Sequence, residues 1–163
     1  MTDPNDALNS LQKALNDGSV RLNKCELNED LQVLLDHPNG VPRFTYAVVK
    51  NGTVQSVAIF ALASPYQGLP CIQIGYAVNI KARGRGLGSK TVQMSIDEFK
   101  NGMSRSGVKD FFLEAVVSIT NDPSKVIADR MISNLPTACV DQFTNEPALQ
   151  YLLRVGSTPQ DAA

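Results

Sequence analysis

The sequence lacks the charge excess and the long apolar runs that are typical of nucleic-acid-binding and membrane proteins. Its 163 residues carry 15 lysines and arginines against 16 aspartates and glutamates, a net charge of −1. A chain with so little net charge has no overall attraction for nucleic acid or for an anionic membrane. No apolar run approaches the length of a membrane span, and the polar first residues do not resemble a signal peptide. We therefore expect a cytoplasmic protein that binds neither nucleic acid nor membranes.

Residues that bind metals or form disulfides are also scarce. The three cysteines, Cys25, Cys71 and Cys139, are odd in number, widely spaced and without the spacing of metal ligands. This pattern indicates reduced, mostly buried thiols. The single histidine, His37, precedes Pro38 in an expected turn and is interpreted as a surface residue rather than a catalytic one. We expect no metal site.

What the sequence does contain is typical of one globular domain. Apolar residues make up 43% of the chain and charged residues 19%, and the length is sufficient for a substantial core. There are no internal repeats, low-complexity tracts or linkers, so we expect a single domain over residues 1–163, with its core at about 20–155.

Local patterns predict the order of helices and strands. Asp3-Pro4 is a typical helix start and Gly18 a typical stop. Asn51-Gly52, a strong hairpin signal, joins strands at 43–50 and 53–63. The other expected elements are a short strand at 19–25, a helix at 28–36 through Leu31, Leu34 and Leu35, a loop at 64–70, a strand at 71–80, a helix at 87–103, a buried strand at 111–118, a helix after Asn121-Asp122-Pro123, paired strands at 137–143 and 149–155, and a frayed tail after Gly156.

The most informative stretch is the Gly-rich turn, residues 83–90, with the sequence Arg-Gly-Arg-Gly-Leu-Gly-Ser-Lys. It lies between a predicted strand and a predicted helix. Glycines let backbone N–H groups approach a ligand closely, and the start of a helix directs such groups and its positive dipole end at one point. Two arginines and a lysine add positive charge. The turn therefore favours a phosphate ligand over a plain flexible hinge.

Three phosphate-binding patterns compete for this turn. A dinucleotide-binding fingerprint needs a glycine where the chain has Ser89, and a Walker loop needs a glycine before Lys90 and a later magnesium-binding aspartate. The pattern Arg-x-x-Gly-x-Gly is satisfied in full by Arg83, Gly86 and Gly88.

On this motif, and on the strand Gly75-Tyr76-Ala77-Val78-Asn79-Ile80 before it, the chain resembles the GNAT superfamily of acetyl-CoA-dependent N-acyltransferases. The resemblance implies an α/β (α+β) fold with a mixed, mostly antiparallel sheet of six to seven strands and about four helices. The sheet would splay between its fourth and fifth strands, here 71–80 and 111–118. It further implies that coenzyme A binds, without a metal, to Val78, Ile80, Arg83, Gly84, Arg85, Gly86, Leu87, Gly88, Ser89, Lys90, Asn121 and Ser124.

The resemblance leaves the acid–base chemistry open. Where the family usually has a tyrosine that protonates the leaving thiolate, this chain has Ala128, and the segment between Glu114 and Asn121 is about two residues longer than usual. Glu114 stands in an apolar strand, in a segment resembling that of ribosomal-protein alanine acetyltransferases. We interpret it as the candidate general base, the alternative being a carboxylate paired with an arginine or exposed to solvent.

The resulting functional hypothesis is an enzyme, an N-acetyltransferase that moves an acetyl group from acetyl-CoA to a primary amine of a small molecule or a protein. The alternatives are a non-catalytic acyl-CoA-binding or interaction module and a nucleotide-binding protein. A homodimer stays open. Tyr46, Tyr66, Glu26 and Asp141 are the candidate residues that line the acceptor site.

Overall fold

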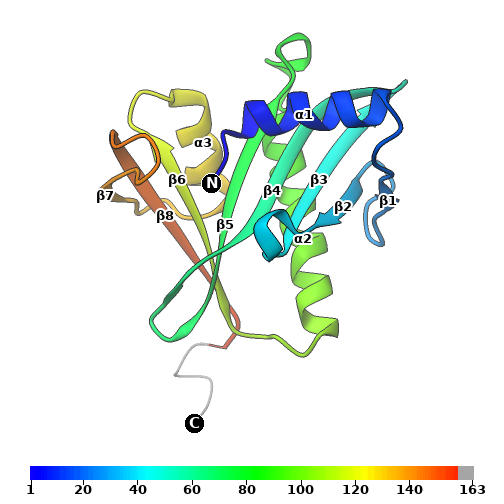
Figure 1. The fold of residues 1–163 in the computed structure, drawn as a ribbon. Coiled ribbons are helices and arrows are strands. Elements are labelled where there is room, and N and C mark those ends of the chain that lie inside the picture. The colour runs from blue at the N-terminus through cyan, green and yellow to red at the C-terminus, as the bar shows by residue number, and fades with distance from the viewer. Residues whose placement is uncertain (158–163) are drawn as a thin grey trace. The chain divides into compact units, whose positions relative to one another are not determined.

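The computed structural model describes residues 1–157, which form three α-helices, two short 3-10 helices and eight strands (Figure 1). The helices are α1 (Pro4–Asn16), η1 (Pro38–Gly40), η2 (Ile80–Ala82), α2 (Leu87–Arg105) and α3 (Asp122–Met131). The strands are β1 (Asn23–Lys24), β2 (Gln32–Asp36), β3 (Arg43–Lys50), β4 (Thr53–Tyr66), β5 (Leu69–Val78), β6 (Phe111–Ser118), β7 (Thr137–Val140) and β8 (Pro147–Val155).

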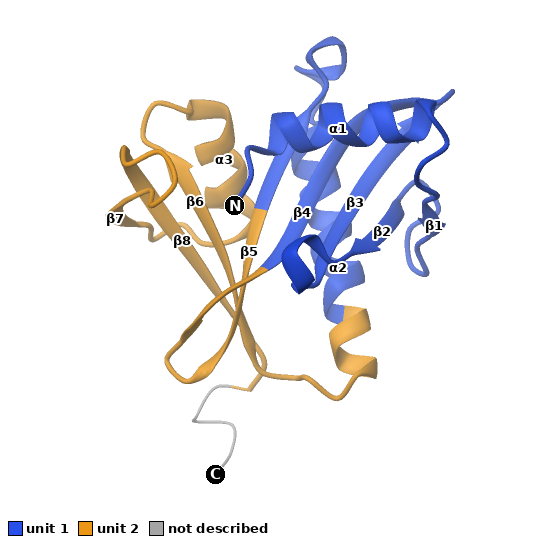
Figure 2. Ribbon diagram, viewed as in Figure 1, with its two compact units in different colours: residues 1–61, 75–100 blue, residues 62–74, 101–163 orange. Residues whose placement is uncertain are grey.

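The chain divides into two compact units (Figure 2). Unit 1 comprises Met1–Ala61 and Gly75–Lys100, and unit 2 comprises Leu62–Ile74 and the chain from residue 101 onward. Strands β4 and β5 and helix α2 each contribute residues to both units. No helix within residues 1–157 is long and apolar enough to cross a membrane.

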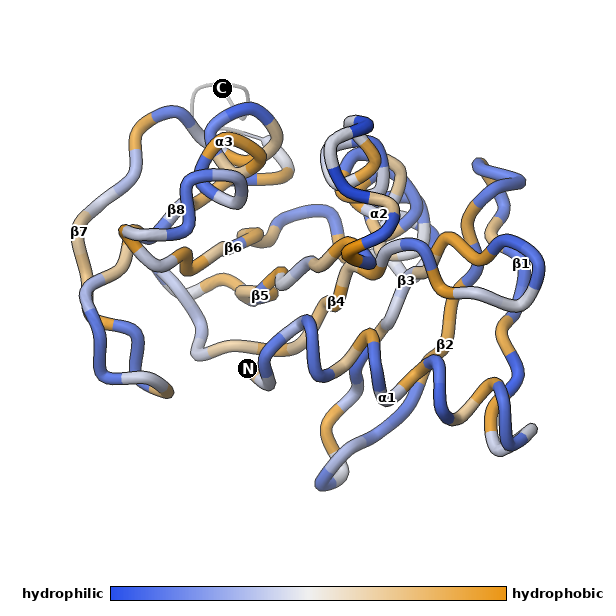
Figure 3. Tube along the Cα trace, turned by 90° about the horizontal axis from the view of Figure 1, so that it is seen from above, coloured by the Kyte–Doolittle hydropathy of each residue, from blue (hydrophilic) through white to orange (hydrophobic). Residues whose placement is uncertain are grey.

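Unit 1 is a sheet with a helix on each face. Strands β1, β2, β3 and β4 pair in this order, each antiparallel to the next. Helix α1 covers one face of the sheet and α2 the other (Figure 3). Leu8 and Leu11 of α1 pack on Ala47 and Val57, whereas Phe99 of α2 lies edge-on to Phe60, with ring centroids 4.9 Å apart. The period-two alternation of strands sends neighbouring residues of β3 and β4 to these two separate cores.

Unit 2 is built around β6. This strand pairs in parallel with β5 and antiparallel with β8, which in turn pairs with β7. Phe111, Leu113, Ala115 and Val117 are buried along one face of β6, whereas Glu114 on the opposite face is half-buried. The mixed sheet confirms the predicted fold class.

The parallel pairing of β5 with β6 is short. It runs from Cys71 opposite Phe112 to Gln73 opposite Glu114, and the rest of β6 pairs only with β8. Within unit 2 the pair therefore spans three residues of each strand, and the part of β5 beyond Ile74 belongs to unit 1.

Most of the predicted elements are present. Strands β3 and β6 have the predicted bounds, and Asn51 and Gly52, with φ of 51° and 76°, form the predicted hairpin turn. β7 and β8 pair as expected. The strand predicted at 19–25 is reduced to β1, and β7 ends at Val140 rather than at residue 143. Of the predicted tail, residues 158–163 lie outside the described residues.

Two predictions for the first half of the chain were wrong. Residues 28–36 do not form a helix, and β2 pairs there with β3, from Gln32 opposite Ala47 to Asp36 opposite Arg43. The described chain therefore has three α-helices rather than four. Residues 64–70 do not form a loop but the tip of the β4–β5 hairpin, where Gln67 and Gly68 have φ of 49° and 75°. Positive φ at both positions suits a tight two-residue turn.

Candidate functional site

The Gly-rich turn lies in unit 1 and its entry is fixed by Asn79. The side-chain oxygen of Asn79 accepts a hydrogen bond from the Lys81 N–H at 3.1 Å and caps η2. Its side-chain amide donates to the Val54 carbonyl at 3.1 Å. These bonds hold the turn to the neighbouring strand. The predicted strand at 71–80 ends at Val78, and Ile80 lies in η2 with 76% of its surface exposed.

The backbone of the turn requires glycine at two positions. Gly84 and Gly86 have φ of 76° and 73°, a region in which side chains with a Cβ are strained. A Cβ built on either glycine meets no other atom within 4 Å. The surface of the turn is therefore open at the points where a ligand would approach the backbone.

Helix α2 begins directly after these glycines. Its first three N–H groups, those of Leu87, Gly88 and Ser89, have no carbonyl four residues earlier within the helix to bond. The next one, of Lys90, donates to the Gly86 carbonyl at 3.2 Å. The start of a helix of 19 residues thus presents several N–H donors together with the positive end of the dipole.

The charged side chains of the turn differ in how free they are. The Arg83 guanidinium donates to the Val78 carbonyl at 3.0 Å and to the side chain of Asn5 at 3.4 Å, so it braces the turn against the end of β5. Lys90 pairs with Asp30 at 3.6 Å, but both side chains are more than 60% exposed and the pair contributes little. Arg85 is exposed. A phosphate at this turn would find positive charge on flexible side chains.

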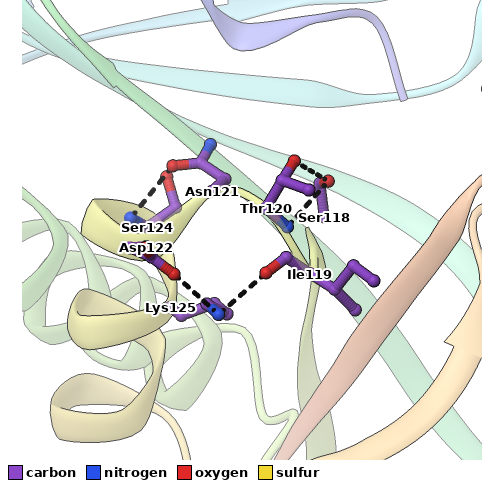
Figure 4. A network of polar contacts seen from close by, with 7 residues as sticks. All are labelled: Ser118, Ile119, Thr120, Asn121, Asp122, Ser124 and Lys125. Atoms are coloured by element: carbon purple, nitrogen blue, oxygen red, sulfur yellow. Dashed lines mark hydrogen bonds and ion pairs between the residues drawn. The ribbon is translucent and has the colours of Figure 1, made fainter.

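Asn121 and Ser124, the other residues predicted to contact the cofactor, lie in unit 2 at the start of α3. The Asn121 side chain accepts a hydrogen bond from the Ser124 N–H at 3.2 Å and caps the helix (Figure 4). Lys125 braces the same loop, with its ammonium 2.8 Å from the Ile119 carbonyl and 2.8 Å from Asp122. The structure therefore gives Asn121 a capping role of its own.

Ala128 of α3, where a tyrosine acid would be expected, is completely buried. A tyrosine has no room at this position without displacing its neighbours. Tyr151 of β8 is 1% exposed and hydrogen-bonded to Asp129 of α3, and the pKa of Tyr151 is raised by burial first and by Asp129 second. Tyr151 is therefore a core residue that attaches α3 to the sheet.

Glu114 points from the half-buried face of β6. Its Oε1 accepts a hydrogen bond of 2.7 Å from the side-chain amide of Gln150, and its Oε2 lies 4.0 Å from the Cys71 sulfur. Burial, with a smaller contribution from the Glu114 charge, raises the pKa of the Cys71 thiol to about 11. Glu114 is not paired with an arginine, because an amide and a thiol are its hydrogen-bond partners, and it is half-buried rather than fully exposed to solvent. Its role as a general base stays a prediction.

A second glutamate was missed from the sequence. Glu98 of α2, in unit 1, is only 7% exposed. Its carboxylate accepts hydrogen bonds from the backbone N–H groups of Glu26, Leu27 and Asn28 at 3.2, 2.6 and 2.8 Å, and from the Asn28 side chain at 3.2 Å. The available signal was the spacing of Thr91, Ser95 and Glu98, which places polar residues on the buried face of a helix.

The proposed acceptor-lining residues are divided between the two units. Tyr46 is buried in the core of unit 1, with its ring centroid 5.2 Å from that of Phe60. Tyr66 packs edge-on against Phe112 at 4.9 Å in unit 2. Among the predicted site residues, Val78, Ile80 and the Gly-rich turn belong to unit 1, and Glu114, Asn121 and Ser124 to unit 2. Residues 1–157 contain no group of histidine, cysteine, aspartate or glutamate side chains that could hold a metal ion.

Comparison with known proteins relates this chain to others through structure alone. No protein-family model matches the sequence, and no curated protein sequence is significantly similar to it. A GNAT-family acetyltransferase from Streptococcus pneumoniae matches with a TM-score of 0.53 and 14% identity, over 95% of this chain and 96% of that one. A ribosomal-protein alanine acetyltransferase from Vibrio fischeri matches with a TM-score of 0.50 and 11% identity, over 70% of this chain and 61% of that one. The chain has the fold of the GNAT acetyltransferases.

Proposed function

We propose that this protein is an N-acyltransferase that moves an acetyl group from acetyl-CoA to a primary amine. The observation that carries the proposal is the Gly-rich turn at the start of α2. It combines two glycines at positive φ, a row of N–H donors at a helix start and positively charged side chains that are exposed. This combination suits a diphosphate such as that of coenzyme A.

The residues present fit that ligand. The diphosphate would lie on the N–H groups of residues 84–89. The space beside Gly84 and Gly86 is open to it because these residues have no Cβ. The exposed side chains of Arg85 and Lys90 would supply positive charge at the edge of the turn. The end of β5 at Val78 would accompany the pantetheine arm, in the manner of an added strand. The roles of Ile80, Asn121 and Ser124 as further contacts remain part of this proposal.

The reaction proposed is direct attack within a ternary complex. The amine nitrogen forms a bond to the thioester carbonyl carbon, the carbon–sulfur bond breaks, and coenzyme A leaves as the thiolate. Glu114 is the proposed base that takes the proton from the amine. No tyrosine acid acts from the position of Ala128, because that position is buried. Holding amine and thioester together supplies several kcal/mol of the barrier reduction, and a thiolate leaves without strong acid assistance.

Ligand binding is the first test, through the melting temperature. Acetyl-CoA and coenzyme A without magnesium should both raise it, because a ligand at 100 times its Kd stabilises the native state by about 2.7 kcal/mol. Stabilisation by ATP or GTP with magnesium, and not by coenzyme A, would instead show a nucleotide-binding protein and contradict the proposal.

A matched pair of glycine variants locates the ligand. Gly86→Ala places a Cβ in the turn, whereas Gly52→Ala places one at φ 76° in the β3–β4 hairpin, also in open space. Both should lose similar stability through backbone strain, roughly 1–2 kcal/mol. Only Gly86→Ala should lose the response to coenzyme A. An equal response in the two variants would remove the turn from the binding site.

The alternative function, a non-catalytic acyl-CoA-binding module, is favoured by the burial of Ala128. It predicts the same thermal shifts. A panel of amines, including polyamines, aminoglycosides, free lysine and peptides with different N-termini, separates the two functions by release of free thiol from acetyl-CoA. Turnover with any of these amines identifies an enzyme and also shows whether the acceptor is a small molecule or a protein.

A further inference from the structure

Gln150 is the only residue of the described chain whose side chain makes a short hydrogen bond to Glu114. In the β6–β8 register, Gln150 lies opposite Val116 and Leu152 lies opposite Glu114, so Gln150 is the diagonal neighbour of Glu114 on the same face. Diagonal neighbours in an antiparallel pair are within reach of long side chains. The bond therefore links two regular, adjacent strands of unit 2 (Figure 1) and does not depend on a loop.

The bond uses one carboxylate oxygen and leaves the other. Gln150 donates to Oε1 at 2.7 Å, a short distance typical of a bond to a charged acceptor. Within residues 1–157, the donor found at Oε2 is the Cys71 thiol, whose sulfur is 4.0 Å away, and a thiol is a weak donor. A carboxylate held in this way has a fixed orientation and a lone pair available on Oε2.

No positive charge competes for Glu114 among residues 1–157. Arg154 lies on the same face of β8, but its guanidinium is 3.4 Å from Asp110 and 3.1 Å from the Ser157 carbonyl. The other titratable neighbours are thiols, Cys71 of β5 and Cys139 of β7, and both thiols have a raised pKa, to which the Glu114 charge contributes. An adjacent guanidinium would weaken a carboxylate as a base, whereas a neutral amide orients it at a smaller cost in basicity.

We propose that Gln150 is a positioning residue for the reaction: its amide holds Oε1 of Glu114 and directs Oε2 toward the proton of the attacking amine. This inference rests on the proposed function, in which Glu114 is the general base.

The test compares Gln150→Met with Gln73→Met. Gln73 of β5 flanks Glu114 on its other side but makes no hydrogen bond to it, so both variants exchange an amide beside Glu114 for an apolar chain of similar length. The measurement is kcat, KM for the amine and the melting response to coenzyme A, with acetyl-CoA as donor. Gln150→Met should lower kcat roughly ten-fold, about the value of one hydrogen bond, with KM and the coenzyme A response nearly unchanged, and Gln73→Met should lower kcat much less.

Two results would overturn the inference. The first is an unchanged kcat in Gln150→Met, or an equal loss of kcat in both variants, because either would show that the hydrogen bond does not govern Glu114. Gln150→Thr suits a strand and is too short to reach Glu114, so it answers the question should the methionine variant not fold.

The second result separates this inference from the proposed function. If kcat falls in Gln150→Met but Glu114→Gln turns over normally, Glu114 is not the base and the positioning role falls with it. If coenzyme A did not raise the melting temperature of the wild-type protein, that result would count against the proposed function instead. It would say nothing about the contact between Gln150 and Glu114, since neither residue belongs to the Gly-rich turn.

Discussion

Two glutamates, one in each unit, show how similar side chains acquire different uses. Glu98 is almost fully buried and accepts four hydrogen bonds, three of them from backbone N–H groups. Glu114 is half-buried and accepts one short hydrogen bond, from a neutral amide. A carboxylate whose acceptor sites are filled by backbone donors holds a loop in place, whereas one with an oxygen that meets only a weak thiol donor is available to take up a proton. The degree of hydrogen bonding, rather than burial alone, separates a structural from a chemical carboxylate.

The same substitution at both positions should give opposite results. For Glu114→Gln we expect turnover to fall roughly ten- to a thousand-fold, the range of general-base contributions, because the amide cannot accept the proton. Affinity for coenzyme A should be nearly unchanged. The measurement is steady-state thiol release at pH 6 to 9, together with a coenzyme A titration. Near-normal turnover across this range would contradict the role of Glu114.

Glu98→Gln should instead lower the free energy of unfolding, by about 3 kcal/mol. The carbonyl oxygen of glutamine can still accept from Leu27 and Asn28, but its amide nitrogen then lies against the N–H group of Glu26, and a buried donor without an acceptor costs about 1–3 kcal/mol. Urea unfolding measures this loss. Asp97→Asn is the control on the same helix, because Asp97 is exposed and its side chain accepts a hydrogen bond from the exposed side chain of Gln93. A loss no larger than that of the control would show that the loop at 26–28 does not depend on Glu98.

The contrast also explains what could be predicted from sequence. The Gly-rich turn was predictable because its glycines, its arginines and the helix start are contiguous in the chain. Glu98 was not, because its partners lie about 70 residues earlier. Gln150 was not, because its bond to Glu114 depends on the register of β6 and β8, which no local pattern states.

The same reasoning applies to the elements. β3 and β6 were predictable because Asn51-Gly52 and a continuous apolar run mark them locally. β2 could not be predicted, because the spacing of Leu31, Leu34 and Leu35 fits a helix. The segment forms a strand because it pairs with β3. Tertiary pairing overrides a short periodic pattern of this kind.

The smallest expected effect concerns Cys71, which reports on the surroundings of Glu114. Its pKa is raised from 9.0 to about 11, by burial first and by Glu114 second. The unfolded chain therefore loses this proton at lower pH than the folded chain. The resulting stability is fully present below pH 9 and is lost as the pH rises from about 9 to about 11.

Unfolding by urea at pH 8, 9, 10 and 11 measures this loss. Other groups also ionise in this range, so the relevant quantity is the difference between the wild type and Cys71→Ala. The variant should lose less stability over the window, by at most about 1.4 kcal/mol per pH unit, because one proton is involved. Glu114→Gln removes the smaller of the two causes of the raised pKa of Cys71. It should therefore lower the upper limit of the pH range in which stability is lost and leave the lower limit unchanged. If Glu114→Gln abolished the difference altogether, the charge of Glu114 rather than burial would dominate at Cys71, and Glu114 would be less accessible to water than its half-buried position indicates.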